Sequence, residues 1–281
     1  KVGVVGGGQM GGGIAELCAK AGMEVIVHEV NQDVAAASQA RIEKSLSKAV
    51  ERGKLSDEDK AAALGRLSFG TDLTAMADRD LVVEAVIENE ELKKELFRQL
   101  DEIVESPDAI LASNTSSIPI TRIATATSRP ESVVGLHFFN PAVVMPLVEV
   151  VRGMLTSDAT VEAARAFAAE QLGKTVVVAK DRAGFIVNML LVPYIIDAMR
   201  MYEEGYASKE DIDAGMVNGA NYPMGPLALS DLIGNDTMLF VAEALFEEFR
   251  EARYAPPPLL KRMVEAGLLG RKTGRGFYDY S

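Results

Sequence analysis

The sequence predicts an α/β protein in which a doubly wound, mostly parallel sheet carries a helical insertion and is followed by an all-helical part. Three observations predict this fold. Short β-branched runs alternate with amphipathic segments through residues 2–180, as in parallel sheets covered by helices. A glycine-rich turn follows the first of these runs, and beyond residue 181 only helical patterns remain.

The composition is that of a globular protein without a disulfide or metal framework. The 281 residues are 48% apolar and 25% charged, enough for one large domain or two ordinary ones. No apolar run reaches the roughly 18 residues of a membrane span. Cys18 is the single cysteine and the histidines are His28 and His137, so we expect no disulfide and no Cys/His metal site. Cys18 follows Ile14 and Leu17 on a helical face, which indicates a buried structural thiol.

The net charge is strongly negative. At −12, the chain is not expected to bind nucleic acid or an anionic membrane. Any anionic ligand must then be met by locally placed cations or by backbone N–H groups. We expect a cytoplasmic protein.

The first element is a strand–turn–helix–strand unit. Residues 2–5 (VGVV) form a strand, a helical pattern covers residues 10–21, and residues 24–30 (EVIVHEV) form the second strand. The glycines between the first strand and the helix have the spacing G-x-G-x-x-G: they are Gly6, Gly8 and Gly11.

This glycine pattern is the Rossmann fingerprint for a dinucleotide. The first glycine permits a tight turn, the second lets a pyrophosphate approach the backbone, and the third lets the helix pack on the strand. Glu29 ends the second strand, 18 residues after Gly11. Its carboxylate can accept hydrogen bonds from a ribose 2′-OH and repels a 2′-phosphate, so the unit predicts NAD rather than NADP. Gly12 and Gly13 exceed the pattern and indicate a further close contact.

Further strands are expected at residues 81–86, 109–115 and 133–138, with a helix at 90–104 between the first two. Ligands of such sheets bind outside the carboxyl ends of the strands. The polar residues at these ends are Glu88, Asn89, Asn114, Thr115, Ser116, His137 and Asn140. Asn89 and Thr115 also fit as ordinary turn formers, whereas His137 lies in an otherwise apolar strand end.

Residues 33–67 form a helical insertion that is too long for a simple connection between strands. One face of its first helix is basic, with Arg41, Lys44, Lys48 and Arg52, and Ser45 and Lys54 lie nearby. Such a stripe is either a solvated face or a cradle for an anion, for instance the phosphates of a large carrier group. Glu43 and Glu51 on the same helix dilute the signal, so both interpretations stay open.

A candidate acid/base pair comes from two strands joined by a proline-bounded loop. Antiparallel pairing of Phe138 with Val148 places His137 opposite Glu149, within reach of a charge-assisted hydrogen bond. A histidine oriented by a carboxylate beside a nicotinamide site is a general acid/base for hydride transfer; the alternative is an ion pair without a catalytic role. A serine hydrolase is disfavoured because the chain has no G-x-S-x-G.

A last strand at residues 175–180 ends the sheet, so the predicted domains are residues 1–181 and 182–281. The second is all-helical, with helices at 185–204, 208–219, 227–250 and 257–267. Its apolar LLVPYII segment indicates packing against a second copy in a homodimer. Asn188 lies near the start of the first of these helices, where it can be presented to a substrate.

The blocks GGGQMG, SNTSS, GLHFFNP, GFIVN, NYPMGP and KTGRGFYDY occur in this order along the chain. With them the chain resembles the short-chain L-3-hydroxyacyl-CoA dehydrogenases, including 3-hydroxybutyryl-CoA dehydrogenases, over essentially its whole length. The resemblance implies NAD-dependent oxidation of an (S)-3-hydroxyacyl-CoA to the 3-ketoacyl-CoA, and the reverse reduction. It also implies a place in fatty-acid β-oxidation or butanoate metabolism and a homodimer formed through the helical domain.

The resemblance also implies roles for single residues. The catalytic pair falls on His137 and Glu149, and Ser116 and Asn188 are counted with it. Substrate contacts fall on Ser45, Arg52, Lys54, Ser116 and Asn188. Cofactor contacts fall on the glycine turn, with Gly6, Gly8, Gln9, Met10 and Gly11, and on residues further along the chain. These are Glu29, Glu88, Lys93, Asn114, Ser116, Asn140 and Lys272.

Two positions depart from the family pattern. Met189 stands where the family often has arginine, and Arg52 stands where it has lysine, with Lys54 two residues on. Which cation meets the phosphates of CoA therefore stays open. The alternatives are a dehydrogenase of a free hydroxy or sugar acid such as gulonate, and a non-catalytic, crystallin-like NAD-binding protein. The intact His137–Glu149 pair argues against the last of these.

Overall fold

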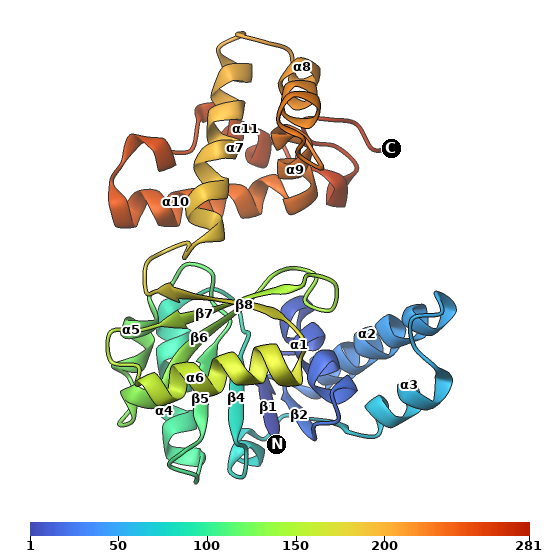
Figure 1. Ribbon diagram of the computed structural model, residues 1–281, viewed down its shortest axis with the longest axis vertical. Coiled ribbons are helices and arrows are strands. Elements are labelled where there is room, and N and C mark those ends of the chain that lie inside the picture. The colour runs from blue at the N-terminus through green and yellow to red at the C-terminus, as the bar shows by residue number, and fades with distance from the viewer. The chain divides into compact units, whose positions relative to one another are not determined.

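The computed structural model describes residues 1–281 and divides into two compact units (Figure 1). Unit 1, Lys1–Arg182, is built on a sheet, and unit 2, Ala183–Ser281, consists of helices and loops. No helix in the chain combines the length and the apolar character that a membrane crossing requires.

The sheet of unit 1 has eight strands in the order β3-β2-β1-β4-β5-β6-β7-β8. Their bounds are β1 Val2–Val5, β2 Val25–His28, β3 Leu67–Gly70, β4 Leu81–Glu84, β5 Ile110–Ser113, β6 Val133–Phe138, β7 Leu147–Arg152 and β8 Thr175–Lys180. Only β6 and β7 are antiparallel; all other neighbouring strands are parallel. The predicted fold class is confirmed. The winding direction changes between β1 and β4, so the carboxyl ends of these strands mark the place where ligands bind in such sheets.

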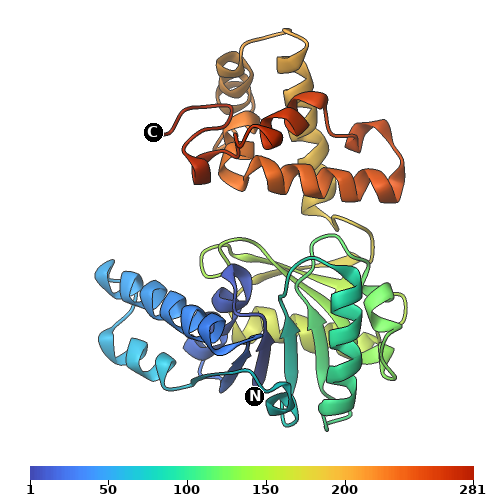
Figure 2. The same ribbon diagram turned by 180° about the vertical axis from the view of Figure 1, so that it is seen from behind.

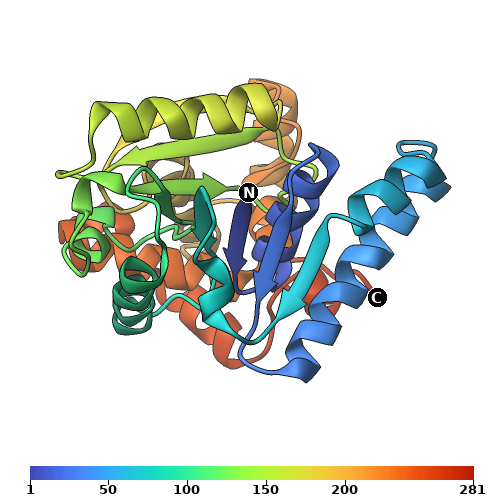
Figure 3. The ribbon, with the colours of Figure 1, turned by 90° about the horizontal axis from the view of Figure 1, so that it is seen from below.

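Helices cover both faces of this sheet. They are α1 Gln9–Lys20, α2 Gln32–Glu51, α3 Asp57–Leu64, α4 Glu90–Ile103, α5 Ile120–Ala124 and α6 Asp158–Ala166, which continues as a π-helical turn, Phe167–Gln171. Short 3₁₀ turns occupy Leu73–Met76 and Pro130–Ser132. Helix α6 lies in front of the sheet in Figure 1 and α4 in front of it from the opposite side in Figure 2. Helices α2 and α3 lie beside the β3 edge (Figure 3).

The β-branched runs form the strands because their side chains fill both faces of a buried sheet. Val4 and Val27 are completely buried and pack in one cluster with Ile14 of α1. Cys18 belongs to the same cluster, and burial raises the pKa of its thiol to about 12. The prediction of a structural thiol is confirmed.

One strand was missed in the sequence analysis, and one predicted helix was wrong. Strand β3 was not predicted, because its LSFG sequence ends in glycine and has a serine in its only exposed position. The single helix predicted at 227–250 is two helices, α9 Pro226–Ile233 and α10 Asn235–Phe249. Gly234 separates them with φ 105°, a conformation that side chains with a Cβ rarely adopt.

Unit 2 is an all-helical bundle. Besides α9 and α10 it contains α7 Val187–Glu203, α8 Lys209–Ala214 with a π-helical turn Gly215–Gly219, α11 Pro258–Glu265, and 3₁₀ turns at Ala252–Tyr254 and Arg271–Thr273. Its core is formed by Ile195, Ile196, Met199, Leu245 and Tyr254, among others.

Candidate active site

The glycine turn leaves room for an anion at the N-terminus of α1. Gly6 has φ 89°, and a Cβ at Gly11 would lie 1.8 Å from the Gly6 carbonyl oxygen, so both positions require glycine. A Cβ at Gly8 would meet no atom within 4 Å. Gly8 is the N-cap residue of α1, and no side chain accepts a hydrogen bond from the first N–H groups of the helix there. Open space before uncapped backbone N–H groups fits the pyrophosphate of a dinucleotide.

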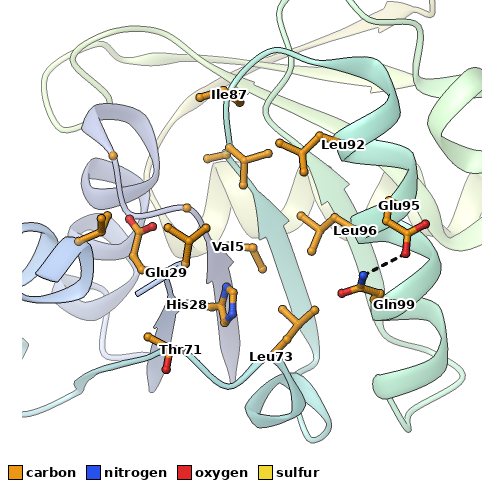
Figure 4. Close-up of a pocket in the computed structure, with 16 residues that line it drawn as sticks. Val5, His28, Glu29, Thr71, Leu73, Ile87, Leu92, Glu95, Leu96 and Gln99 are labelled. Atoms are coloured by element: carbon orange, nitrogen blue, oxygen red, sulfur yellow. Dashed lines mark hydrogen bonds between the residues drawn. The ribbon is translucent and has the colours of Figure 1, made fainter. Parts of the chain in front are cut away.

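Glu29 lies beside this turn, at the mouth of a cavity of about 700 Å³. Its Oε1 accepts a 2.7 Å hydrogen bond from the Gly7 N–H, which fixes the carboxylate at the end of β2. Figure 4 shows the cavity between β1, β2 and α4, with Leu73 and Leu96 among its apolar side chains. His28 also lines it, and burial lowers the pKa of this imidazole. An apolar slot that also carries the Glu29 carboxylate suits a flat base attached to a ribose.

Of the residues that line this cavity, Gly6, Gly8 and Glu29 were predicted from sequence as cofactor contacts. The lining residues come from segments far apart in the chain, and most of them are ordinary apolar residues. Besides Glu29, the residues that line the cavity are Val5, Gly6, Gly8, His28, Val30, Val34, Thr71, Leu73, Ala85, Val86, Ile87, Leu92, Glu95, Leu96 and Gln99.

The cations of the basic stripe on α2 differ in their contacts. Arg41 donates a 2.8 Å hydrogen bond to the Gly7 carbonyl, and the buried Ser38 donates another at 2.7 Å. Arg41 therefore supports the glycine turn. The other cations of the stripe, Lys44, Lys48, Arg52 and Lys54, are exposed along α2 and just beyond its end.

Ser45 lies beside a small cavity of about 120 Å³ between α1, α2 and the loop after β6. Glu16 is buried on the wall of this cavity; burial raises its pKa, and a hydrogen bond with Ser45 opposes that shift. Gly12 and Gly13, the two glycines beyond the G-x-G-x-x-G pattern, line the same cavity. A Cβ at Gly13 would lie 3.1 Å from the Cβ of Ala142, a tight contact that favours glycine at this helical position.

A buried ionic cluster occupies the ends of β4 and β5. Glu84 on β4 accepts hydrogen bonds from Lys93 Nζ at 2.5 Å, from the Val86 N–H at 2.7 Å and from Ser113 Oγ at 2.6 Å. Lys93 on α4 also lies 3.2 Å from Glu88 Oε2. Glu84 and Lys93 are 0% and 1% exposed. The Lys93 ammonium thus lies between the carboxylates of Glu84 and Glu88 and contacts both.

Glu88 in turn holds the loop that follows β5. Its Oε1 accepts hydrogen bonds from the Thr115 hydroxyl, the Ser116 N–H at 3.1 Å and the Ser117 hydroxyl at 3.0 Å. Although burial by itself would raise the pKa of Glu88, Lys93 and these hydroxyls hold it below its usual value. Glu88, Lys93 and Ser116 are therefore brought together, and Glu84 is the member of this cluster that was not predicted.

The predicted contact between His137 and Glu149 is formed. His137 on β6 pairs with Glu149 on β7 in the predicted register, and Phe138 pairs with Val148. The His137 Nδ1 lies 2.7 Å from Glu149 Oε2, and the two residues are 6% and 0% exposed. With Nδ1 held by the carboxylate, proton exchange with a substrate would run through Nε2.

Two amides frame this pair. Asn114 accepts a 2.9 Å hydrogen bond from the Phe138 N–H, which ties the end of β5 to the histidine strand. Asn140 accepts one from Gln9 Nε2, also at 2.9 Å, which ties the loop after β6 to the start of α1. In unit 1 the predicted residues thus come together along the carboxyl edge of the sheet, except for the cations on α2.

Unit 2 carries three further residues of interest. Asn188 lies in the first turn of α7, directly after a tight turn in which Gly184 has φ 77° and Phe185 has φ 46°. Met189 packs on the apolar core, and its sulfur accepts a 3.5 Å hydrogen bond from the Tyr254 hydroxyl. Lys272 pairs with Asp236 at 2.6 Å; burial by itself would raise the pKa of Asp236, but the lysine holds it below its usual value.

Comparison with known proteins covers the chain from end to end. The family model for "3-hydroxyacyl-CoA dehydrogenase, NAD binding domain" matches residues 1–182, and that for "3-hydroxyacyl-CoA dehydrogenase, C-terminal domain" matches residues 184–280. A 3-hydroxybutyryl-CoA dehydrogenase of Mycobacterium tuberculosis is 55% identical over 100% of this chain and 98% of its own. The human mitochondrial hydroxyacyl-coenzyme A dehydrogenase is 45% identical over 99% of this chain and 90% of its own.

Solved structures give the same result. The crystal structure of M. tuberculosis FadB2 superposes with a TM-score of 0.98 at 55% identity, covering 100% of this chain and 99% of that one. The (S)-3-hydroxybutyryl-CoA dehydrogenase PaaH1 of Ralstonia eutropha superposes with a TM-score of 0.94 at 47% identity, covering 100% and 98%.

Proposed function

The chain belongs to the 3-hydroxyacyl-CoA dehydrogenase family and is an oxidoreductase, and from this premise we propose that it oxidises (S)-3-hydroxybutyryl-CoA to acetoacetyl-CoA and catalyses the reverse reduction. The observation that supports this most strongly is the buried His137–Glu149 pair at 2.7 Å, at the carboxyl edge of a dinucleotide-binding sheet. Relatives of 44–55% identity with this printed activity support the short-chain substrate.

In the oxidation, His137 is the general base. Its Nε2 accepts the proton of the substrate hydroxyl, and Glu149 stabilises the imidazolium through its contact with Nδ1. Bound NAD⁺ supplies the acceptor for the hydride that leaves the same carbon. In the reduction His137 returns the proton to the developing alkoxide. Both residues are nearly inaccessible to water, which strengthens their interaction.

The family supports NAD(H) as the cofactor, and a preference for NAD over NADP is part of the proposal. Glu29 supports it, because a carboxylate fixed by the Gly7 N–H repels a 2′-phosphate. Gly6, Gly8, Gln9, Met10 and Gly11 are proposed to surround the pyrophosphate, and Glu88, Lys93, Asn114, Ser116, Asn140 and Lys272 to contact or support the rest of the cofactor.

For the CoA thioester we propose that Ser45, Arg52 and Lys54 contact the CoA part and that Ser116 and Asn188 contact the reacting end. The exposed cations at the end of α2 favour the cradle over a merely solvated face, since an acidic chain must bind phosphates with local cations. A cytoplasmic location remains part of the proposal.

We also propose a homodimer formed through unit 2. Apolar side chains are exposed on its helices and turns in the single chain, including Leu190 (71%) and Tyr206 (78%), together with Phe240 and Leu232. Exposed apolar residues in this number within one small unit are typical of a surface that another chain covers.

The test is NADH consumption, followed by absorbance, with acetoacetyl-CoA as the oxidised substrate. The proposal predicts turnover with the thioester and little with free acetoacetate. Turnover with free oxo acids or sugar acids instead would identify a free-acid dehydrogenase, and binding of NADH without any turnover would identify a non-catalytic binding protein.

A further inference from the structure

Glu84 is a completely buried carboxylate that none of the roles above requires. Two of its three contacts can only donate, the Lys93 ammonium and the Val86 N–H, and both lie on Oε1; the third is the Ser113 hydroxyl. An ammonium at 2.5 Å and a backbone N–H at 2.7 Å favour the ionised carboxylate.

The same reasoning applies to Glu88. Its contacts are hydroxyls and N–H groups of the Thr115–Ser117 segment and the Lys93 ammonium. The buried cluster therefore holds two carboxylates and one ammonium, which gives a net charge of about −1 beneath the ends of β4 and β5. Of the neighbouring charges on α4, Glu90 pairs with Lys94 and with Arg122, and Glu91 pairs with Lys94.

The position of this charge follows from the sheet order. A dinucleotide bound to a doubly wound sheet spans the switch point, which lies between β1 and β4 in this chain. Glu29 and the apolar cavity assign the adenosine half to the β2 side. The nicotinamide half then extends toward the ends of β4 and β5, where the cluster lies.

We propose that Glu84 biases the site toward the oxidised cofactor. The nicotinamide ring carries a positive charge in NAD⁺ and none in NADH, so a net negative cluster at this end of the sheet stabilises the oxidised form selectively. Glu84 contributes the unbalanced charge because Lys93 balances only one of the two carboxylates. This role rests on the proposed function, since it requires a nicotinamide cofactor in this sheet. Glu84 is completely buried, so it acts through its charge and does not touch the cofactor.

The test compares the dissociation constants of NAD⁺ and NADH in variants that change the cluster's charge. Glu84→Gln keeps the shape and leaves Lys93 paired with Glu88, but brings the net charge to zero. Glu84→Asp keeps the net charge at −1 and shortens the side chain, so it disturbs the contacts with Lys93 and Ser113 without changing the charge. The control is Glu91→Gln, which makes the same change of charge on α4 at a side chain that is 80% exposed and therefore screened by solvent.

Binding is measured by NADH fluorescence, with NAD⁺ titrated by displacement; the chain has no tryptophan to interfere. We expect Glu84→Gln to raise the ratio Kd(NAD⁺)/Kd(NADH) about tenfold, the size of a unit-charge effect in a partly buried site. Glu84→Asp keeps the wild-type ratio, and the control leaves it unchanged. A merely structural role for Glu84 would weaken the binding of both forms equally and leave their ratio unchanged in both Glu84→Gln and Glu84→Asp.

An unchanged ratio in folded Glu84→Gln overturns the inference, and so does a tenfold rise of the ratio in Glu84→Asp, which keeps the charge. Should Glu84→Gln fail to fold, Glu84→Ala removes the same charge and is measured in its place; an unchanged ratio there overturns the inference as well. Failure of the wild-type chain to bind either form of the cofactor would contradict the proposed function itself, which separates the two claims.

Discussion

Replacing Glu149 by glutamine tests how the acid/base pair works, because it removes a charge and leaves the shape. The carboxylate meets His137 Nδ1 at 2.7 Å, and both residues are more than nine-tenths buried. A hydrogen bond to a charged group contributes about 1.5–3 kcal/mol, and about 1.4 kcal/mol corresponds to a factor of ten in rate. If that stabilisation is realised mainly when the imidazolium forms, Glu149→Gln lowers kcat by about 10- to 150-fold.

The comparison that isolates the mechanism is a double-mutant cycle. His137→Gln removes the general acid/base and is expected to lower kcat by about a hundredfold or more. Because Glu149 acts on the reaction through His137, the double variant is expected to be no slower than His137→Gln alone. The assay is NADH consumption at saturating acetoacetyl-CoA, with NADH binding by fluorescence as the control for an intact cofactor site.

Two results would refute this reasoning. Additive losses in the double variant would mean that Glu149 acts on the substrate independently of the histidine. A rise in KM with unchanged kcat for Glu149→Gln would mean that the carboxylate contributes only uniform binding.

Four further outcomes are expected. The wild-type chain should have a higher kcat/KM with NADH than with NADPH, because the Glu29 carboxylate repels a 2′-phosphate. Replacing Glu29 by a neutral residue should reduce the difference between the two kcat/KM values. Equal kcat/KM values in the wild type would contradict this. Arg52→Ala/Lys54→Ala should raise the KM for acetoacetyl-CoA several-fold, since each exposed contact contributes about 1 kcal/mol or less. The KM for a pantetheine thioester, which lacks the nucleotide phosphates, should hardly change. An equal rise in both KM values would mean that the stripe is only a solvated face. Sedimentation at micromolar concentration should show a dimer, and a species of only the 30.2 kDa chain would count against the interface. Cys18, whose pKa is raised to about 12, should stay unreactive toward a disulfide reagent at pH 8 until the protein unfolds, because the thiolate is not populated at that pH; rapid reaction in the native state would contradict its burial.

The parts of the fold that could be predicted are those that local sequence specifies. The glycine turn and Glu29 share one short strand–helix–strand unit, and the His137–Glu149 register follows from two strands joined by a short loop. Strand β3 could not be predicted, because its few residues lack a β-branched pattern and its place depends on pairing with β2. Gly234 could not be assigned in advance, because a glycine in a helical pattern fits a helix interior as well as a break.

The parts of the site that were missed depend on contacts between distant segments. Arg41 has the spacing of the basic stripe, but only the folded chain shows that it reaches the Gly7 carbonyl. Glu84 stands in the LVVEAV run as an acidic residue in a buried strand, and its partners Lys93 and Ser113 lie on two other elements. Periodicity predicts which face a residue occupies, and it does not predict which partner the residue meets there.

The most direct test of the central claim is the rate of NAD⁺ reduction with (S)-3-hydroxybutyryl-CoA, compared between the wild-type chain and His137→Gln. The account predicts turnover by the wild type, none with free (S)-3-hydroxybutyrate, and a loss of about a hundredfold or more in the variant while NADH still binds. Equal turnover by the two proteins, or turnover with the free acid at the rate of the thioester, would contradict it.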